Sequence, residues 1–417
     1  MNRKKESKVV PNVRFKGFTD DWKQRKLGDV SEIIGGGTPS TNHPEYWDGD
    51  IDWYSPAEIL DQIYVKRSQR RITKLGYDNS SAKLLPPGTV LFTSRAGIGK
   101  TAILSQKSCT NQGFQSIVPH ENELDTYFIF SRTNALKRYG ELVGAGSTFA
   151  EVSGKQMSAM NLMLPTTIQE QQVIGQFFKK LDRLITLHQQ KITLLTKLKK
   201  AMLEKMFPKK GSVIPEFRFN GFANAWEQRK LENFGKATGG TSIESEFSED
   251  GIYKVISIGS YSENSVYNDQ GIRAIKSDKT SNRVLNKNDL TMILNDKTTS
   301  GNIIGRVLLI EKSGIYVYNQ RTERIEININ EYDPVFLYEM LNAPNIREKI
   351  IKQAQGNTQI YVNWSTIAML DYMIPSKKEQ VKIGQFLHSI SNIITLYQRK
   401  IDKIKNMKKA MLDQMFI

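Results

Sequence analysis

Two long stretches of the chain carry apolar residues three and four positions apart, in a common register. The first stretch, residues 167–206, contains no proline and only one glycine, Gly175. A seam of this period, sustained over more than four heptads, is typical of a coiled coil. The seam positions are Ile174, Phe178, Leu181, Ile185, His188, Ile192, Leu195, Lys199, Met202 and Met206 in the first stretch, and Ile383, Leu387, Ile390, Ile394, Tyr397, Ile401, Ile404, Lys408, Met411 and Met415 in the second.

Each seam predicts a helix of roughly 40 residues, about 60 Å long at 1.5 Å per residue. Pro165 and Pro375 lie just before the two stretches, and Pro208 ends the first. Two ordinary surface helices of separate domains are the alternative, but the shared register, the length and the terminal placement favour pairing. Since a whole domain lies between the two helices, we expect them to pair antiparallel and to form a rigid spacer.

The intervening segments follow a different pattern, in which short apolar runs are bounded by turn residues. The first segment predicts strands at residues 88–94 and 101–104 and a helix at 127–139, and the second predicts strands at 289–294 and 305–310 and a helix from 334 to about 353. The predicted fold class is α/β, with two pseudo-symmetric α/β recognition domains separated by two long helices that form an antiparallel coiled coil. We place the domains at residues 1–165 and 209–375, and the spacer helices at 166–208 and 376–417.

The chain repeats itself once. Residues 11–27 and 215–231 are identical at 10 of 17 positions, and residues 170–207 and 379–416 are identical at 19 of 38, at an offset of 209. Between these blocks only traces recur, such as Gly36-Gly37-Thr38 beside Gly239-Gly240-Thr241 and Asn111-Gln112 beside Asn319-Gln320. If the two copies had diverged uniformly after a duplication, the ends of each half would not have stayed similar while the middle changed. We interpret the shared blocks as meeting identical partners and the middles as meeting different ones.

Charge and composition narrow the class of partner. The 417 residues include 59 Lys and Arg against 43 Asp and Glu, a formal net charge of +16, which indicates a polyanion such as nucleic acid or an anionic membrane surface. The single cysteine, Cys109, excludes a disulfide framework and a Cys-based metal site. No apolar run approaches the roughly 18 residues of a membrane span, and the basic N-terminus lacks the apolar stretch of a secretory signal. We therefore expect a cytoplasmic protein in a reducing compartment.

Motifs for catalysis are weak or missing. Residues 94–101 end in Gly-Lys-Thr like a phosphate-binding P-loop, but Ser94 stands where that loop needs glycine. The only Pro-Pro pair, Pro86-Pro87, reads as a turn and not as the Asn/Asp-Pro-Pro-Tyr/Phe motif of a base-flipping methyltransferase. The four histidines do not recur between the halves as metal ligands would: His43, His120, His188 and His388. We expect no catalytic residue, metal site or cofactor in this chain.

Several motifs together carry a resemblance. Arg-Phe-x-Gly-Phe-x-x-x-Trp-x-x-x-Lys-Leu begins at Arg14 and again at Arg218, and it resembles the start of each half in specificity subunits of type I restriction–modification systems. Residues 79–88, 94–100 and 111–114 and the Glu-Gln pairs that open the long helices, at 170–171 and 379–380, match the same family. The family often has Pro-Leu-Pro-Pro before each long helix, whereas here Leu164-Pro165 leads into Thr166-Thr167 and the second copy has Pro375-Ser376. The chain also departs from the family at residues 295–302, a longer loop than its counterpart.

The resemblance implies a function and a set of partners. Each half would be a target recognition domain that reads one part of a gapped, asymmetric site in double-stranded DNA. Two methyltransferase subunits would dock on the shared regions to methylate adenine, and restriction subunits would join them. S-adenosylmethionine, ATP and Mg²⁺ would belong to those partner subunits, and no membrane would be involved.

Such a subunit needs only to bind DNA, with groove contacts reading bases and basic residues holding phosphates. We predict DNA contacts on the basic or turn-like stretches of both middle segments: Arg70, Arg71, Lys74, Arg95, Lys100 and Gln112 in the first, and Arg273, Lys276, Lys279, Lys297, Arg306 and Arg321 in the second. Gly97, Gly99 and Gly305 are expected to serve tight turns.

Two other classes of function stay open from the residues alone. A self-contained methyltransferase or nuclease with its own recognition domains would show methyl transfer or cleavage by the isolated chain. A polybasic coiled-coil scaffold would prefer anionic vesicles or RNA over duplex DNA at matched salt.

Overall fold

The computed structural model describes residues 10–95, 97–144, 150–297 and 299–417. The basic N-terminal segment, Ala96 of the P-loop-like stretch and Thr298 of the longer second-half loop lie outside the described residues. The chain divides into two compact units, one of Met1–Gln189 with Arg399–Ile417 and the other of Gln190–Gln398. Each long helix therefore contributes one part to each unit.

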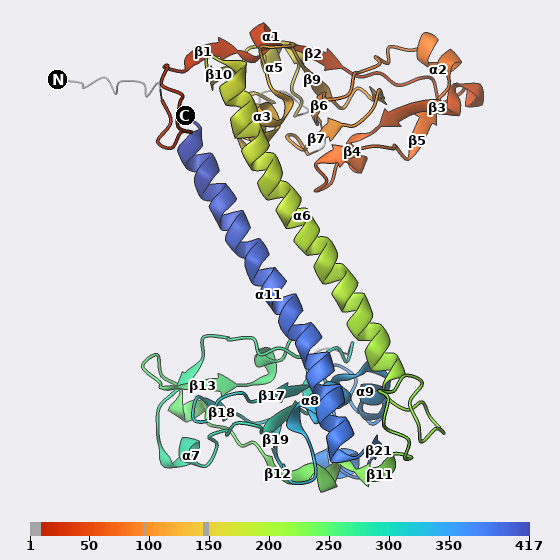
Figure 1. Ribbon diagram of the computed structural model, residues 1–417, viewed down its shortest axis with the longest axis vertical. Coiled ribbons are helices and arrows are strands. Elements are labelled where there is room, and N and C mark those ends of the chain that lie inside the picture. The colour runs from red at the N-terminus through yellow and green to blue at the C-terminus, as the bar shows by residue number, and fades with distance from the viewer. Residues whose placement is uncertain (1–9, 96, 145–149, 298) are drawn as a thin grey trace, which may run out of the picture. The chain divides into compact units, whose positions relative to one another are not determined.

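Two larger sheets form the body of the first unit. The larger has the strand order β2-β9-β6-β7-β4, and the smaller has the order β5-β3-β8 (Figure 1). The strands are β2 (Ser31–Gly35), β3 (Trp47–Tyr54), β4 (Tyr64–Val65), β5 (Arg70–Ile72), β6 (Val90–Phe92), β7 (Thr101–Leu104), β8 (Cys109–Thr110) and β9 (Gln115–Pro119). Strand β6 is buried on both faces of the larger sheet, because Val90 and Phe92 share one core with Ile117 while Leu91 belongs to a second core.

The second unit repeats this topology with a different sequence. Its four-stranded sheet has the order β12-β19-β15-β17, its three-stranded sheet has the order β14-β13-β18, and a short β16-β20 pair is added. The strands are β12 (Gly235–Gly239), β13 (Tyr253–Ile256), β14 (Arg273–Ala274), β15 (Leu290–Ile293), β16 (Asn295–Asp296), β17 (Val307–Leu309), β18 (Tyr316–Tyr318), β19 (Thr322–Ile327) and β20 (Ile360–Tyr361). The duplication read from the ends of the halves therefore extends through the diverged middles.

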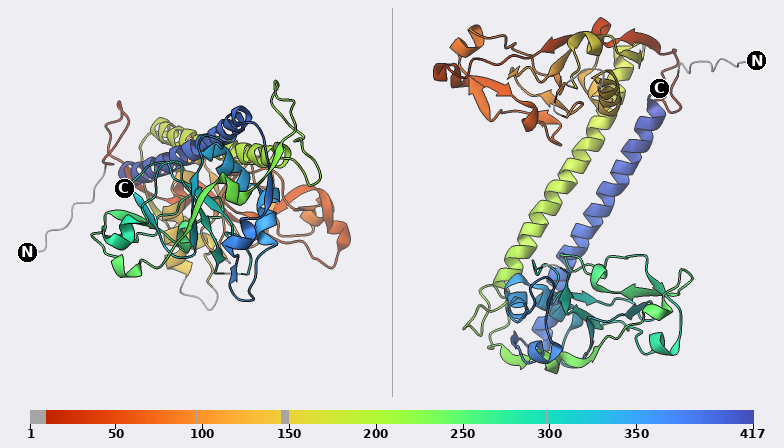
Figure 2. Two further views of the ribbon diagram at one scale, coloured as in Figure 1. Left: turned by 90° about the horizontal axis from the view of Figure 1, so that it is seen from below. Right: turned by 180° about the vertical axis from the view of Figure 1, so that it is seen from behind.

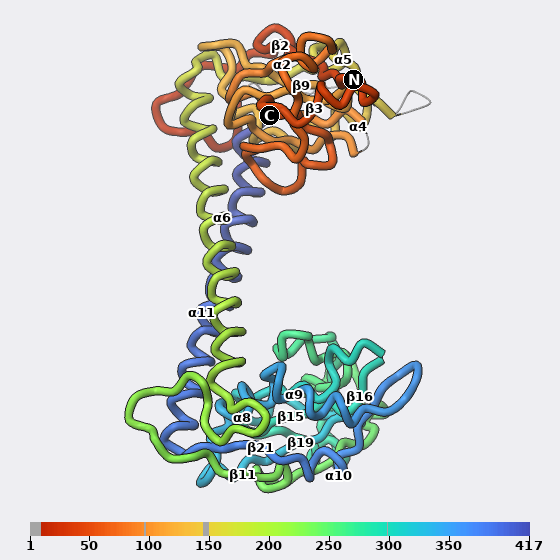
Figure 3. The backbone as a smooth tube through the Cα atoms, turned by 90° about the vertical axis from the view of Figure 1, so that its right-hand side faces the viewer, coloured from red at the N-terminus to blue at the C-terminus, as the bar shows by residue number. Residues whose placement is uncertain are grey.

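Short helices complete each unit. In the first they are α1 (Leu27–Val30), α2 (Lys74–Asp78), α3 (Thr126–Ser131), α4 (Thr133–Gly144) and α5 (Gly154–Ser158), and in the second α7 (Asp278–Ser281), α8 (Pro334–Asn342), α9 (Pro344–Ile351) and α10 (Trp364–Ile367). Figure 3 shows α8 and α9 against the strands of the second unit, where Met340 and Ile350 share a core with Leu290.

The two shorter helix predictions were wrong in one respect, because each helix is interrupted. The predicted helix at 334–353 breaks at Ala343, which has extended geometry with ψ 134°, because the ring of Pro344 excludes a helical residue before it. The predicted helix at 127–139 breaks at Arg132, whose buried guanidinium donates to the Met163 carbonyl at 3.1 Å. The predicted strands at 88–94, 101–104, 289–294 and 305–310 are confirmed as β6, β7, β15 and β17.

The two long helices are α6 (Ile168–Lys205) and α11 (Lys377–Met415). Every predicted seam position is buried or half-buried, which confirms the heptad assignment. In the first unit the last turns of α11 lie beside the first part of α6 (Figure 2). There Lys408 Nζ lies 2.5 Å from Asp182 Oδ1. In the second unit Lys199 Nζ donates to Ser391 Oγ at 2.6 Å. From the first of these contacts to the second, the residue number rises on α6 by as much as it falls on α11. This is the relation expected for two antiparallel helices.

The repeated opening block has an internal structural role. β1 (Lys23–Lys26) pairs with β10 (Asn161–Leu164), and β11 (Glu227–Lys230) pairs with β21 (Asp371–Ile374), in matching antiparallel registers. Arg14 Nε lies 2.6 Å from Glu170 Oε1, and Arg218 Nε lies 2.7 Å from Glu379 Oε1. Because both glutamates are buried, each pair fixes the opening segment onto the first turn of a long helix. Much of the identity in these blocks is therefore explained by packing inside each unit.

Candidate nucleic-acid interface

The two short motifs that survive in both middles meet each other in the first unit. The turn after β8 carries Asn111 and Gln112, and the loop after β2 carries Gly36, Gly37 and Thr38. Gly37 N–H donates to the Thr110 carbonyl at 2.9 Å, and the Thr38 hydroxyl donates to Gln112 Oε1. A Cβ on Gly36 would lie 2.0 Å from the Asn111 carbonyl oxygen, so only glycine allows this approach. The two motifs thus form a single loop pair.

The second unit also brings its own copies of the two motifs together, but through different hydrogen bonds. Gly240 N–H donates to the Thr322 carbonyl at 2.8 Å, and a Cβ on Gly240 would lie 2.1 Å from the Asn319 carbonyl oxygen. Asn319 Oδ1 accepts from Ile243 N–H of the other loop at 3.1 Å, whereas Asn111 Oδ1 accepts from Gly113 N–H within its own turn at 2.8 Å. Both asparagines are used internally, whereas the next residue, Gln112 or Gln320, is exposed.

An arginine stacked on tryptophan adjoins the loop pair of the first unit. The Arg70 guanidinium carbon lies 3.6 Å from the centroid of the Trp47 ring, and Trp47 packs edge-on against Trp53 at 5.1 Å. Trp53 Nε1 in turn donates to the Gly37 carbonyl at 2.8 Å. Since Arg70 is exposed and its flat cation rests on an aromatic face, the cluster holds a positive charge in a fixed place on β5, in the same sheet as the strand β8 that precedes Gln112.

The second unit replaces this arrangement with different residues. Arg283 Nη1 donates to the Gly239 carbonyl at 2.7 Å and to the Tyr318 hydroxyl at 3.0 Å, and its guanidinium lies 5.2 Å from the Tyr318 ring centroid. Glu323, opposite Gly239 in the β12–β19 register, is only 5% exposed. Burial raises the pKa of Glu323 to about 7, and the Arg283 charge opposes this shift.

The β6–β7 loop adjoins the Asn111-Gln112 turn, because Ser94 N–H donates to the Gly113 carbonyl at 2.8 Å. Arg95 in this loop pairs with Glu151 at 2.7 Å, and Lys100 is exposed. Lys100 is followed by strand β7, whereas the lysine of a P-loop is followed by a helix. The resemblance to a nucleotide-binding loop is therefore limited to the sequence. Gly97, Gly99 and Gly305 have φ of 99°, 94° and 72°, which confirms their predicted role in tight turns.

The other predicted residues of the first half lie near Arg70. Arg71 follows Arg70 on β5 and is exposed. Lys74 opens α2, where it pairs with Asp78 and lies 5.1 Å from the Tyr77 ring centroid. Arg70, Arg71 and Lys74 therefore lie together on β5 and α2, and the β6–β7 loop that holds Arg95 and Lys100 meets the turn that contains Gln112.

The second-half candidates are more dispersed. Arg273 on β14 pairs with Asp269 at 2.8 Å, and this guanidinium lowers the pKa of the Asp269 carboxyl. Lys276 and Lys297 are exposed, and Lys279 donates to Ser245 Oγ at 3.0 Å beside the Gly240 loop. Arg306 is half-buried, donates to the Asn302 carbonyl at 2.8 Å and to Ser265 Oγ at 3.0 Å, and has a pKa lowered by burial. These contacts give Arg306 a role inside the domain, and its contact with DNA stays a prediction.

Arg321 has an unusual backbone. Its φ of 69° lies in the left-handed region that favours glycine, and its side chain is exposed at the end of the Asn319-Gln320 turn. Its carbonyl accepts from Leu294 N–H at 2.9 Å, as the Gly113 carbonyl accepts from Ser94 N–H in the first unit. A long cation held in a strained turn is typical of a functional position.

Sequence reasoning missed three kinds of residue. Gln320 stands in the same repeated motif as Gln112, so the repeat itself could have indicated it. Arg283 and the Trp47–Trp53 pair had no such signal, because their places depend on strand pairing. Among the residues that the structure describes, no group of three His, Cys, Asp or Glu side chains could hold a metal ion, and no helix is long and apolar enough to cross a membrane.

Both halves of the chain match known proteins. A family model described as the type I restriction modification DNA specificity domain matches residues 19–197 and again residues 224–406. The chain is 32% identical over 234 residues to the type I restriction enzyme MjaIX specificity subunit of Methanocaldococcus jannaschii, which covers 53% of each chain. It is 24% identical over 405 residues to the MjaVIII specificity subunit of the same organism, covering 94% of this chain and 92% of the relative.

Two further comparisons concern length and fold. The Escherichia coli EcoR124I/EcoR124II specificity subunit is 32% identical over 180 residues, covering 41% of this chain and 43% of the relative. The matches with this subunit and with the MjaIX subunit thus span about half of each relative's length. The crystal structure of a type I restriction–modification S subunit from M. genitalium has a TM-score of 0.66 at 13% identity, covering 98% of this chain and 99% of that one, which shows the same fold.

Proposed function

The chain belongs to the family of type I restriction–modification DNA specificity domains, and from that premise we propose that it is the specificity subunit of such a system. In this role it binds double-stranded DNA in the cytoplasm, and each half reads one part of a gapped, asymmetric target. The chain itself carries out no chemistry. Adenine methylation and restriction are performed by partner subunits, which hold S-adenosylmethionine, ATP and Mg²⁺.

This proposal rests on one observation: both units contain the same pair of loops, but the side chains around the loops differ. Both units pair a Gly-Gly-Thr loop with an Asn-Gln turn at the same place in the same strand order. Around that frame the first unit has Arg70 on Trp47, whereas the second has Arg283 on Tyr318 and the strained Arg321. Two domains that recognise different half-sites need the same backbone scaffold and different side chains around it. Phosphate contacts position both domains in the same way, whereas base contacts specify the DNA sequence that each recognises.

Purified complexes on duplex DNA test this proposal. Gln112→Ala and Gln320→Ala each remove an exposed amide from one loop pair, so each should weaken binding to a cognate duplex by about 1–3 kcal/mol. Gln69→Ala, an exposed glutamine beside Arg70 in sequence, is the matched control. Unchanged affinity in both loop variants would contradict the placement of the interface at the loop pairs.

The partner proposal rests on exposed residues that recur in both long helices. Thr186-Leu187 of α6 recurs as Thr395-Leu396 of α11, and none of the four is buried. Leu187 is 47% exposed and Leu396 is 50% exposed. Leu184 recurs as Ile393 and Leu198 as Met407, and these four side chains are also exposed. At 100° per residue the exposed apolar positions of each helix fall on one stripe.

Exposed apolar residues at equivalent positions favour two copies of one partner, because identical surfaces bind identical molecules. We assign the methyltransferase subunit to these stripes, one copy for each. Leu187→Asp should then leave a complex with one methyltransferase copy, Leu396→Asp should do the same, and the double variant should bind none. Native mass measurement decides this, with Leu142→Asp on α4, at a side chain 77% exposed, as the control. A single variant that loses both copies or neither would contradict the two-site arrangement.

A further inference from the structure

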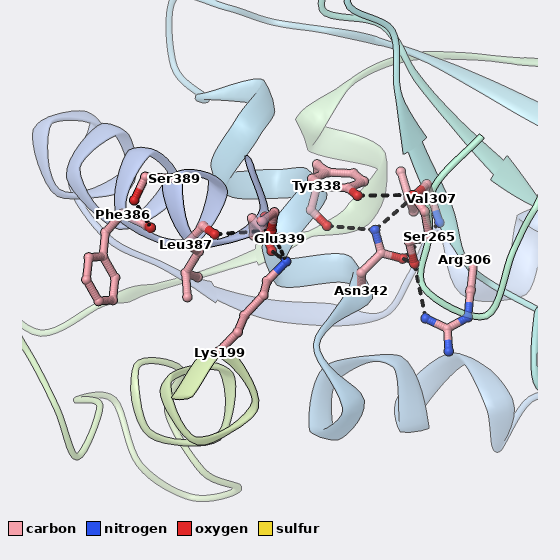
Figure 4. Close-up of polar contacts among 11 residues, drawn as sticks. Lys199, Ser265, Arg306, Val307, Tyr338, Glu339, Asn342, Phe386, Leu387 and Ser389 are labelled. Atoms are coloured by element: carbon pink, nitrogen blue, oxygen red, sulfur yellow. Dashed lines mark hydrogen bonds and ion pairs between the residues drawn. The ribbon is translucent and has the colours of Figure 1, made fainter. Parts of the chain in front are cut away.

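A lysine interrupts the apolar seam at the same position of both long helices. Lys199 of α6 and Lys408 of α11 correspond at the repeat offset of 209, and both are half-buried. Lys199 Nζ lies 2.7 Å from Glu339 Oε2, on the recognition-domain helix α8 (Figure 4). It also lies 2.6 Å from Ser391 Oγ, on α11. One ammonium group therefore joins α6, α11 and α8 within the second unit.

The first unit has the same lysine contact between helices, but there the carboxylate lies on the long helix and not on the recognition-domain helix. Lys408 Nζ lies 2.5 Å from Asp182 Oδ1 on α6, and Asp182 Oδ2 accepts from the Tyr127 hydroxyl at 2.9 Å. Tyr127 belongs to α3, which takes the place of α8 in this unit. At the repeat offset Asp182 corresponds to Ser391, so the carboxylate has moved from the spacer helix to the recognition domain while the lysine has stayed. A partner that relocates while the contact is kept indicates that the contact itself matters.

A buried ion pair adds little net stability, but it makes wrong pairings costly. In any shifted register the ammonium would face apolar seam residues and the carboxylate, 1% exposed at Glu339 and 7% at Asp182, would lose its partner. A single polar residue in an apolar seam is known to specify register in this way. These pairs also fix the recognition domain, because α8 holds Val307 and, through Asn342 and Ser265, the Arg306 side chain (Figure 4).

We propose that Lys199 and Lys408 are positioning residues that set the register of the spacer helices, and thereby the gap between half-sites that the protein accepts. The inference rests on the proposed function. A slip of one heptad moves one helix past the other by about 10 Å, or close to three base-pair rises of 3.4 Å. The lysines therefore control which gap length between the half-sites the protein prefers. They do not affect which bases it recognises within each half-site.

The test replaces one junction by apolar residues of similar size. Lys199→Met with Glu339→Met should keep the chain folded, because a buried ion pair can be exchanged for packed apolar residues without loss of stability. Methylation by the complex is measured on duplexes with the native half-sites and gaps from three base pairs shorter to three longer. We expect the preference for the native gap to fall at least about tenfold, which corresponds to 1.4 kcal/mol. Lys200→Met, at an exposed neighbour, should keep the native preference.

A second variant separates register from folding. Ser391→Asp with Glu339→Gln moves the carboxylate to the place that it occupies in the first unit, so it should keep the native gap preference. The proposal is overturned if the apolar variant, folded by its melting temperature, keeps the wild-type gap preference, or if the transplanted pair folds and loses it. A wild-type complex that methylates no gapped duplex would instead overturn the proposed function.

Discussion

Replacing Glu323 by glutamine should make the second unit more stable at alkaline pH and leave it unchanged at acid pH. Glu323 is 5% exposed on β19, and burial raises its pKa to about 7. In the first unit the equivalent strand position, opposite the last glycine of β2, is occupied by Gln115. The glutamine amide has the shape of the protonated carboxyl group and no charge, so we expect it to fit at position 323.

The sign and size follow from proton linkage. The folded state holds the Glu323 proton more tightly than the unfolded chain, whose carboxyl has an ordinary pKa of 4.5. The stabilisation is therefore complete below pH 4.5 and is lost as the pH rises through about 7. At 1.36 kcal/mol per pKa unit the full effect is about 3 kcal/mol, and relaxation around the charged form reduces it to about 1–3 kcal/mol. Glu323→Gln removes this loss.

Urea unfolding followed by intrinsic fluorescence, at pH values from about 5 to 9, measures the effect. We expect wild type and Glu323→Gln to coincide near pH 5, and the variant to gain about 1–3 kcal/mol by pH 9. Glu326→Gln, at an exposed position of the same strand, should follow the wild-type curve. Parallel curves for wild type and Glu323→Gln at every pH, or a gain confined to pH 5, would refute the reasoning.

Three further predictions concern DNA binding and the spacer. Affinity of the complex for duplex DNA should fall about 10³- to 10⁵-fold between 50 and 200 mM salt if six to ten phosphates are neutralised, and a titration that hardly changes would contradict the electrostatic account. Arg321→Gly should raise the free energy of unfolding by up to about 1 kcal/mol, because glycine relieves the strain of the left-handed backbone conformation at this position. The same variant should bind DNA more weakly, and an affinity equal to that of the wild type would show that Arg321 is not part of the interface. Four residues inserted after Ala201 should lengthen the spacer by about 6 Å, so methylome mapping should show unchanged half-sites and a gap one or two base pairs longer; altered bases with an unaltered gap would count against the spacer model.

The long helices could be predicted from the sequence nearly to the residue. The expected range 167–206 became Ile168–Lys205, because a seam repeated over many turns leaves few alternative assignments. The helix expected at 334–353 was wrong in its middle, although Pro344 was visible in the sequence, because apolar periodicity continues across the break. The repeat also predicted that both halves share one architecture, and the strand orders bear this out.

The candidate interface was predicted only in part. The repeated Gly-Gly-Thr and Asn-Gln motifs were visible, but their meeting depends on β2 pairing with β9 and β12 with β19, which local patterns do not encode. Arg283 and Trp47 gave no signal for the same reason. The shared blocks were interpreted as partner surfaces, whereas Arg14 and Glu170 form a contact within the unit; the exposed Thr186-Leu187 repeat carries that interpretation instead.

The central claim is that each half reads its own part of the DNA target, and a domain exchange tests it most directly. Residues 38–162, which span the first recognition segment, are replaced by the matching segment of a relative with a different target, and methylated adenines are mapped across the genome. The account predicts that one half-site changes while the other half-site and the gap stay as they were. A change in both half-sites, or in neither with methylation retained, would contradict it.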